Sequence, residues 1–181
     1  MSSTPSWLEN ARSHWTNRGD SRPAFAVEPA EGQESVWDYP RPPAIVADTR
    51  LVEVRHGDVL IASTNEAIRI LETSHPPSFY LPPASITEGV LVAVPGSSHC
   101  EWKGQAEYVG LSPAATAIGW RYPSPYPEFT MCAGYVSFYP DAVECRVDDE
   151  LVRAQAGGFY GGWITNEVVG PFKGETGTSG W

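Results

Sequence analysis

The sequence contains few cysteines and few basic residues, and these shortages exclude several classes of protein. Its three cysteines, Cys100, Cys132 and Cys145, form no C-x-x-C pair and lack the spacing of a zinc site. We therefore expect structural thiols, with no bound metal and no other cofactor. The sequence leaves open a metal site from Glu72, His75, His99 and Asp58, although no pair of these residues has a diagnostic spacing. Lysine and arginine total 12 against 22 acidic residues, and the resulting net charge of -10 repels phosphate backbones. We expect no nucleic-acid partner.

Long apolar runs are also missing. No stretch approaches the roughly 20 residues that cross a bilayer, and residues 1–19 lack the basic start and apolar middle of a secretory signal. These features predict a soluble, cytoplasmic protein without a membrane partner. The sequence leaves open whether the chain forms a homodimer.

Proline, glycine and aromatic residues are abundant instead. The chain of 181 residues holds 17 Pro, 17 Gly, 7 Trp, 8 Tyr and 6 Phe. This mixture favours a turn-rich β protein over a helical bundle. The length suits one main domain with flanking segments. We therefore predict a mainly β fold built from antiparallel sheets.

Three regions follow one another along the chain. Residues 1–43 predict an N-terminal arm, with a helix over 6–18 and then a proline-rich tether. Apolar residues recur with a period of two over residues 44–150, which predicts an antiparallel β domain. Residues 151–181 are rich in glycine and aromatic residues, and we expect this extension to pack on the domain.

Two hairpins and a further strand are predicted inside the β domain. Residues 44–63 alternate on both sides of a turn at Gly57, and residues 134–147 alternate on both sides of Pro140-Asp141. Residues 66–73 fit a strand or a short helix, and we favour the strand.

Lysine is rare, so its two positions are informative. Both lysines stand between an aromatic residue and a glycine, in Trp102-Lys103-Gly104 and in Phe172-Lys173-Gly174. A lysine beside aromatic groups can have a lowered pKa, bind a carboxylate or donate a proton. The alternative is a surface lysine with a partly covered stem. We favour Lys103, because strict alternation over residues 100–108 predicts that it lies on a strand, on the face opposite Trp102.

A carboxylate and an imidazole lie close together at Glu72 and His75, just before a double proline. This spacing suits acid-base chemistry, although a local hydrogen-bonded turn is the alternative. The segment "GGFYGGWITNEVVGPFKG", residues 157–174, has neither the dinucleotide nor the Walker spacing of a phosphate loop. We expect its glycines to let the backbone bend or pass close to an aromatic neighbour.

Four motifs occur in order: "ILETSHPPSFYLPPASI", "HCEWKGQAEYVG", "GWRYPSPYPEF" and "GYVSFYPDAVECRVDDELV". Together they resemble the domain of unknown function 427 family over about residues 44–150. The resemblance implies a fold similar to the β-tent proteins, such as methionine sulfoxide reductase B and the thalidomide-binding domain of cereblon. Those relatives often hold zinc with two C-x-x-C pairs, which this chain lacks. The family has also carried a nucleotidyltransferase-like label, but Asp148-Asp149-Glu150 predicts a hairpin turn rather than a metal-binding carboxylate pair.

These features predict a pocket for a small molecule between two β sheets. The leading hypothesis is an acid-base enzyme, an isomerase, dehydratase or hydrolase of a polar or carbonyl-bearing metabolite. Lys103 would donate a proton or polarise a carbonyl, and Glu72 would act as base. The alternatives are a non-catalytic module that binds a sugar or an aromatic ring, and a structural or interaction module, so enzymatic activity stays open. The other predicted ligand-binding residues are His75, Tyr80, Trp102, Trp120, Tyr122 and Tyr160.

Overall fold

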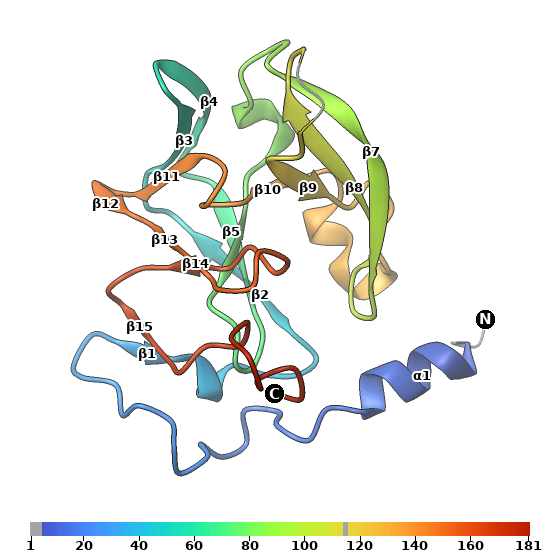
Figure 1. Cartoon of the computed structure of the whole chain (residues 1–181), viewed down its shortest axis with the longest axis vertical. Helices are drawn as coiled ribbons and strands as arrows, with labels where there is room; N and C mark the ends of the chain where they lie inside the picture. Colours follow the sequence, from blue (N-terminus) through green and yellow to red (C-terminus); the bar gives the residue numbers. More distant parts are fainter. Residues whose placement is uncertain (1–4, 114–115) are drawn as a thin grey trace.

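Strands carry most of the regular structure of the chain, and the helices are short. The computed structural model describes residues 5–113 and 116–181, so residues 1–4 of the predicted arm lie outside the described residues. Figure 1 shows α1 (Ser6–Ser13), the single α-helix in the described residues, close to the N-terminus. No helix in the described part of the chain is long and apolar enough to cross a membrane. The prediction of a mainly β fold with an N-terminal helical arm is confirmed, although the helix ends five residues before the predicted residue 18.

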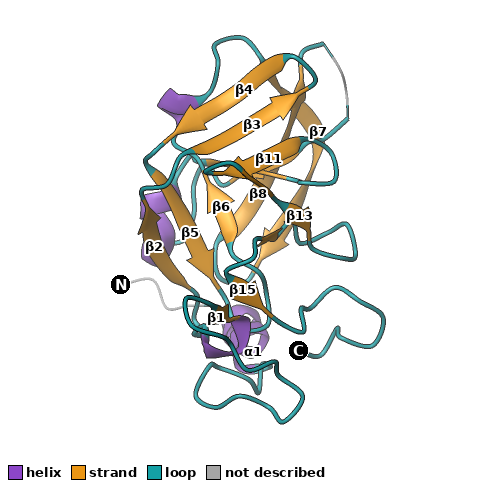
Figure 2. Cartoon of the chain, turned by 90° about the vertical axis from the view of Figure 1, so that its left-hand side faces the viewer, coloured by secondary structure: helices purple, strands orange, loops and turns teal. Residues whose placement is uncertain are grey.

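Three antiparallel sheets form the body of the fold, and Figure 2 shows their strands above the loops and α1. The three-stranded sheet has the order β2 (Ala44–Asp48), β5 (Ala67–Leu71), β6 (Ser78–Tyr80). One four-stranded sheet has the order β12 (Glu150–Leu151), β11 (Glu144–Val147), β3 (Val52–His56), β4 (Val59–Thr64). The other has the order β10 (Val136–Phe138), β9 (Gly119–Arg121), β8 (Gly104–Leu111), β7 (Leu91–Cys100).

Shorter elements complete the architecture. Two pairs of two-residue strands involve the flanks: β13 (Arg153–Ala154) with β14 (Trp163–Ile164), and β1 (Glu34–Ser35) with β15 (Val168–Val169). The second pair is parallel. The described residues also form three 3-10 turns: η1 (Val36–Asp38), η2 (Pro83–Ser85) and η3 (Pro127–Cys132).

The predicted hairpins are only partly correct. The turn at Gly57 does join β3 to β4, and the predicted strand near residues 66–73 is β5. However, β2 pairs with β5 rather than with β3. The predicted hairpin over residues 134–147 is wrong, because β10 pairs with β9 whereas β11 pairs with β3. Alternating apolar residues give each strand a buried face, but they do not specify its partner.

The segment that carries Lys103 also differs from its prediction. Strand β7 ends at Cys100 and β8 begins at Gly104, so Trp102 and Lys103 lie in the turn of a hairpin rather than on opposite faces of one strand. Both side chains are buried. Gly104 has φ +97°, a conformation that suits glycine and directs the chain into β8. The alternation over residues 100–108 therefore describes β8 only from Gly104 onward, and its first four residues belong to the end of β7 and to the turn.

The C-terminal extension contributes to the main core. Trp163 on β14 is fully buried, and its ring stacks on Phe79 with centroids 4.8 Å apart and planes 18° from parallel. Its indole Nε1 donates to the carbonyl oxygen of Phe138 at 2.9 Å. A tryptophan from the extension thus fills the space between β6 and β10. The predicted division of the chain near residues 43 and 150 stays a prediction.

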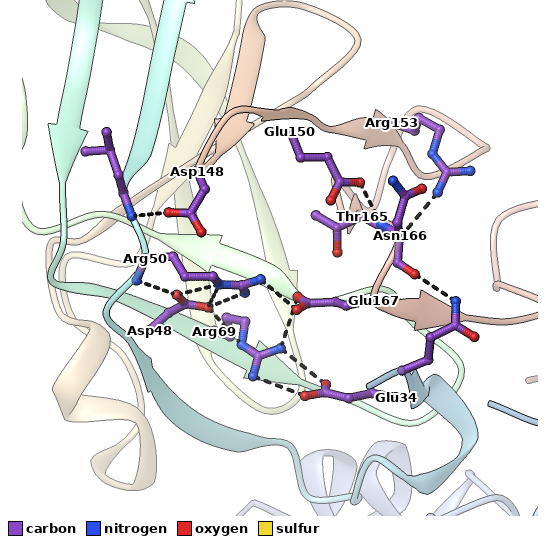
Figure 3. A network of polar contacts seen from close by, with 12 residues as sticks. Glu34, Asp48, Arg50, Arg69, Asp148, Glu150, Arg153, Thr165, Asn166 and Glu167 are labelled. Atoms are coloured by element: carbon purple, nitrogen blue, oxygen red, sulfur yellow. Dashed lines mark hydrogen bonds and ion pairs between the residues drawn. The ribbon is translucent and has the colours of Figure 1, made fainter. Parts of the chain in front are cut away.

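A network of ion pairs ties both flanks to the sheet of β2 and β5 (Figure 3). Arg50 binds Asp48 and also Glu167, with Nη1 to Oε2 at 2.6 Å. Arg69 on β5 lies 3.2 Å from Asp48 and 3.2 Å from Glu34. Because Glu34 begins β1 and Glu167 precedes β15, the network holds the parallel pair of flanking strands against the three-stranded sheet.

Candidate functional site

A cavity of about 280 Å³ contains both lysines of the chain. Its walls come from the sheet of β5 and β6, from the sheet of β7 and β9, and from both flanks. A volume of this size suits a small metabolite. Aromatic and ionisable side chains dominate its lining, among them Trp15, Glu72, His75, Tyr80, Cys100, Lys103, Trp120, Tyr122, Tyr139, Tyr160 and Lys173.

The structure brings most of the sequence-predicted site residues to this cavity. Seven of them line it: Glu72, His75, Tyr80, Lys103, Trp120, Tyr122 and Tyr160. Trp102 is the exception, because it is buried outside the cavity wall with the Arg12 guanidinium 5.3 Å from its ring centroid. The roles of these residues in binding or catalysis stay predictions.

Aromatic side chains form one wall. The indole of Trp120 donates to the hydroxyl of Tyr80 at 3.0 Å, and the Tyr139 ring lies 4.6 Å from the Trp120 ring. Burial raises the pKa of Tyr80 above its ordinary range, so the phenol stays protonated. Since its oxygen accepts from Trp120, the hydroxyl hydrogen of Tyr80 remains a donor for another group.

A glycine of the C-terminal extension makes this wall possible. Gly161 has φ +67°, and a Cβ at this position would lie 2.5 Å from Cη2 of Trp120. Only glycine therefore allows the backbone to pass so close to the indole. This geometry agrees with the expectation that the glycines of residues 157–174 accommodate an aromatic neighbour.

Lys103 presents a buried cation to the cavity. Its Nζ lies 5.8 Å from the centroid of the Tyr122 ring. Burial alone would lower the pKa of Lys103, but its interactions with Cys100, Tyr80 and Glu72 outweigh burial and raise it above its ordinary value. The lowered pKa of Glu72 keeps its carboxylate negatively charged at neutral pH. Lys103 is therefore an ammonium group under ordinary conditions.

Glu72 is held in its charged form by positively charged neighbours. Its Oε1 accepts from Nε of Arg41 at 3.0 Å, and the Arg41 side chain is completely buried. Burial would raise the pKa of Glu72, but His75 in its protonated form and the permanent positive charges of Lys103 and Arg41 lower it overall. The cavity thus contains a carboxylate and an ammonium, both ionised at neutral pH.

The tautomer of His75 follows from its hydrogen-bond partners. Gln155 accepts from the N–H of Gly162 through Oε1 and donates to the Lys173 carbonyl oxygen through Nε2, so the orientation of its amide is fixed. The same Nε2 lies 3.1 Å from Nδ1 of His75. Nδ1 must therefore accept, and in the neutral ring Nε2 carries the hydrogen.

The pKa of His75 makes the stability of the protein dependent on pH. Burial lowers this pKa to about 4, and Glu72 opposes the shift while Lys173 and Arg41 add to it. Below pH 6.5 the unfolded chain binds a proton at His75 that the folded chain does not bind. The stability that the neutral, buried His75 contributes is thus complete above pH 6.5 and is lost as the pH falls toward 4. Between pH 7 and 5 we expect the free energy of unfolding to drop by about 2 kcal/mol through this residue.

Urea unfolding at several values in that interval measures the slope. His75→Gln should flatten this slope, and His56→Gln, at the exposed end of β3, is the control for the loss of a histidine. An equal slope in His75→Gln and the parent chain would contradict the buried neutral imidazole. The measurement stops at pH 5 because Glu72, whose pKa is lowered, takes up its proton only in more acidic solution and so does not add to the slope.

Sequence reasoning missed three residues that build the site. Lys173 lines the cavity, although the sequence pattern favoured Lys103 as the site lysine. Trp15 reaches the cavity from the segment after α1, where its Nε1 donates to Glu101 at 2.8 Å. Arg41 holds Glu72 and stacks on Trp15, with Cζ 4.5 Å from the ring centroid. The sequence signal for Lys173 was the aromatic-Lys-Gly triplet that it shares with Lys103. In the structure both triplets have the same local form, a buried lysine followed by a glycine with positive φ.

Within residues 5–113 and 116–181, no three His, Cys, Asp or Glu side chains gather in a way that could hold a metal ion. A comparison with curated proteins found no match. A protein-family model described as "Domain of unknown function (DUF427)" matches residues 44–152, more than half of the chain. This match agrees with the resemblance of the four sequence motifs, and the chain belongs to the domain of unknown function 427 family.

Proposed function

We propose that the chain binds a small, polar, carbonyl-bearing metabolite in this cavity and acts on it by acid-base chemistry, as an isomerase, dehydratase or hydrolase. One observation supports this function above all: Glu72 and Lys103, two groups of opposite charge, line one small cavity with aromatic walls. Charged groups that are held in such a site act strongly on a ligand, because little water screens them. The proposed partner is a small molecule rather than nucleic acid.

The two groups would have separate roles. The raised pKa of Lys103 keeps the ammonium charged, so it would polarise a carbonyl and stabilise the negative charge that develops on the oxygen. Arg41 binds Oε1 of Glu72, and in the described part of the chain Oε2 has no hydrogen-bond donor. That oxygen would accept a proton from the carbon next to the carbonyl.

Non-catalytic binding is a second candidate, and the ion pair of Glu72 with Arg41 favours it. The pair lowers the pKa of Glu72, and a carboxylate of lower pKa is a weaker base. The rings of Trp120 and Tyr122 would then stack on a sugar or an aromatic ring.

The two candidates are separated by proton exchange. A panel of small aldehydes, ketones and 2-oxo acids is incubated with the protein in D₂O, and deuterium at the carbon next to the carbonyl is followed by NMR. For an acid-base enzyme we expect Lys103→Met and Glu72→Gln each to slow the exchange roughly 100-fold or more. Trp102→Phe is the matched control, because Trp102 is buried outside the cavity wall.

Ligand-observed NMR on the same variants completes the test. Binding that Lys103→Met abolishes, with no deuterium exchange in any variant, would favour the non-catalytic module. Binding and exchange that are equal in the parent chain and in both cavity variants would refute both candidates. The melting temperature of each variant shows whether it is folded.

A further inference from the structure

Lys173 is a buried lysine of the cavity that the proposed acid-base reaction does not use. Only 2% of the residue is exposed. Its N–H donates to the carbonyl oxygen of Ser74 at 2.9 Å, and its own carbonyl oxygen accepts from Gln155 at 2.6 Å. Because the backbone is held on both sides, the side chain has a fixed starting direction toward the cavity that it lines.

The amino group of Lys173 lies among aromatic rings. Its Nζ is 3.8 Å from the centroid of the Trp15 ring and 5.6 Å from that of Tyr160. It donates one hydrogen bond, to the Trp181 backbone oxygen at 2.9 Å. Two of the three hydrogens of an ammonium would thus have no partner in the described part of the chain. The rings replace water, which favours the uncharged amine.

A second cation lies close to this amino group. Nη2 of Arg41 donates to the same Trp181 oxygen at 3.2 Å, so the two nitrogens are no more than about 6 Å apart. The Arg41 guanidinium cannot lose its proton to relieve the repulsion. The negative charge next to it, Glu72, is bound to Arg41 itself. Lys173 is therefore the group that responds to the repulsion.

Opposing effects act on the charge of Lys173. The face of Trp15 attracts a cation, and Glu72 and Glu101 also favour the charged form. Burial and the positive charge of Arg41 prevail, and they lower the pKa of Lys173 to about 8. At pH 7 the fraction of free amine is then roughly 300-fold larger than for an ordinary lysine. Lys103, by contrast, stays an ammonium because its pKa is raised.

We propose that Lys173 is a nucleophile, which forms a Schiff base with the carbonyl carbon of a small aldehyde or keto compound in the cavity. A bond forms between Nζ and the carbonyl carbon, and the carbon–oxygen double bond breaks. The two hydrogens of the amine leave with that oxygen as water, so no oxidant or reductant is needed. The proposal rests on the proposed function only in that the cavity admits a carbonyl compound. Lys103 then serves as the fixed cation of the same site.

Reductive trapping tests the bond directly. The full chain is incubated near neutral pH with pyruvate or with glycolaldehyde and sodium cyanoborohydride, and the adduct is located by peptide mass mapping. The chain has only two lysines, so Lys173→Met and Lys103→Met form a matched pair. We expect one lysine adduct, at Lys173, in the parent chain and none in Lys173→Met. Lys103→Met should form less adduct, still at Lys173, because the fixed cation of the cavity is lost. An adduct at Lys103, or equal labelling of both lysines, would overturn the proposal.

A second measurement needs no variant and no carbonyl ligand. Trace acetic anhydride labels the parent chain at a series of pH values, and each lysine is quantified against the unfolded chain. Lys173 should reach half of its maximal labelling near pH 8 and, at pH 7, react roughly 100-fold faster than Lys103. A labelling midpoint for Lys173 at pH 10.5, the ordinary lysine value, would refute its role as a nucleophile.

The outcomes separate this proposal from the proposed function. If Lys103→Met and Glu72→Gln abolish deuterium exchange while Lys173 forms no adduct, the acid-base enzyme stands and the nucleophilic lysine is wrong. An adduct at Lys173 without any deuterium exchange supports the nucleophile and argues against Glu72 as base.

Discussion

Replacing Arg41 by methionine is expected to lower the free energy of unfolding by about 3–5 kcal/mol. The Arg41 side chain is completely buried, and it binds Glu72 at 3.0 Å. Its Nη2 also donates to the carbonyl oxygen of Thr73 at 2.9 Å and to the backbone oxygen of Trp181 at 3.2 Å. Methionine has a similar length but no donor. The substitution would leave the buried Glu72 carboxylate without its guanidinium and two backbone oxygens without this donor, and an unpaired buried charge is strongly destabilising.

Chemical denaturation of three variants measures this effect. Arg41→Met alone should show the full loss, and the pair Arg41→Met with Glu72→Met should recover much of it, because both charges are then gone. Arg22→Met is the control, since Arg22 forms partly exposed ion pairs with Glu28 and Asp38. That control should leave the unfolding midpoint nearly unchanged. A double variant less stable than Arg41→Met would show that the carboxylate is not the source of the loss.

Trp163→Ala is expected to cost about 3–5 kcal/mol, by the loss of a large buried ring. The indole fills the core between β6 and β10 and stacks on Phe79. Its Nε1 donates to the carbonyl oxygen of Phe138 at 2.9 Å, and this oxygen would lose its donor. The cost is expected in the unfolding of the whole β domain, even though residue 163 follows the family match at residues 44–152.

Two further variants divide the effect into its parts. Trp163→Phe keeps an aromatic ring on Phe79 and removes the hydrogen bond, so its loss should be clearly smaller than that of alanine. Trp7→Ala removes an indole that is 53% exposed on α1 and should change the stability little. If Trp163→Ala unfolded at the same urea concentration as the parent chain, the extension would not be part of the cooperative core.

The sequence predicted elements whose signal is local, and it failed where distant residues decide. The turn at Gly57 and the strand β5 follow from a few neighbouring residues, and both are present. The pairings of β2 with β5 and of β11 with β3 depend on residues that lie far along the chain. The same alternation fits several partners equally well, so the predicted hairpin around Pro140 was wrong.

The part of the candidate site that could be predicted from the sequence is the part that contains rare residues or a distinctive spacing. The scarcity of lysine and the spacing of Glu72 and His75 led to side chains that do line one cavity. Trp15 and Arg41 gave no such signal, because a tryptophan near a helix and an arginine between prolines are compatible with many environments. Their importance arises from contacts that join three distant segments, in which Arg41 stacks on Trp15 and binds Glu72.

The parallel pair of β1 and β15 affects how the protein is made. Gln33, next to β1, donates to the carbonyl oxygen of Asn166 across 133 positions of sequence. Ribosomes build the chain from its N-terminus, so β1 and Arg41 emerge long before their partners. Contacts of such long range form slowly, because a large loop must close first. A nascent chain that has reached β12 still lacks Tyr160 and Lys173, so the cavity is complete only after these two residues have emerged.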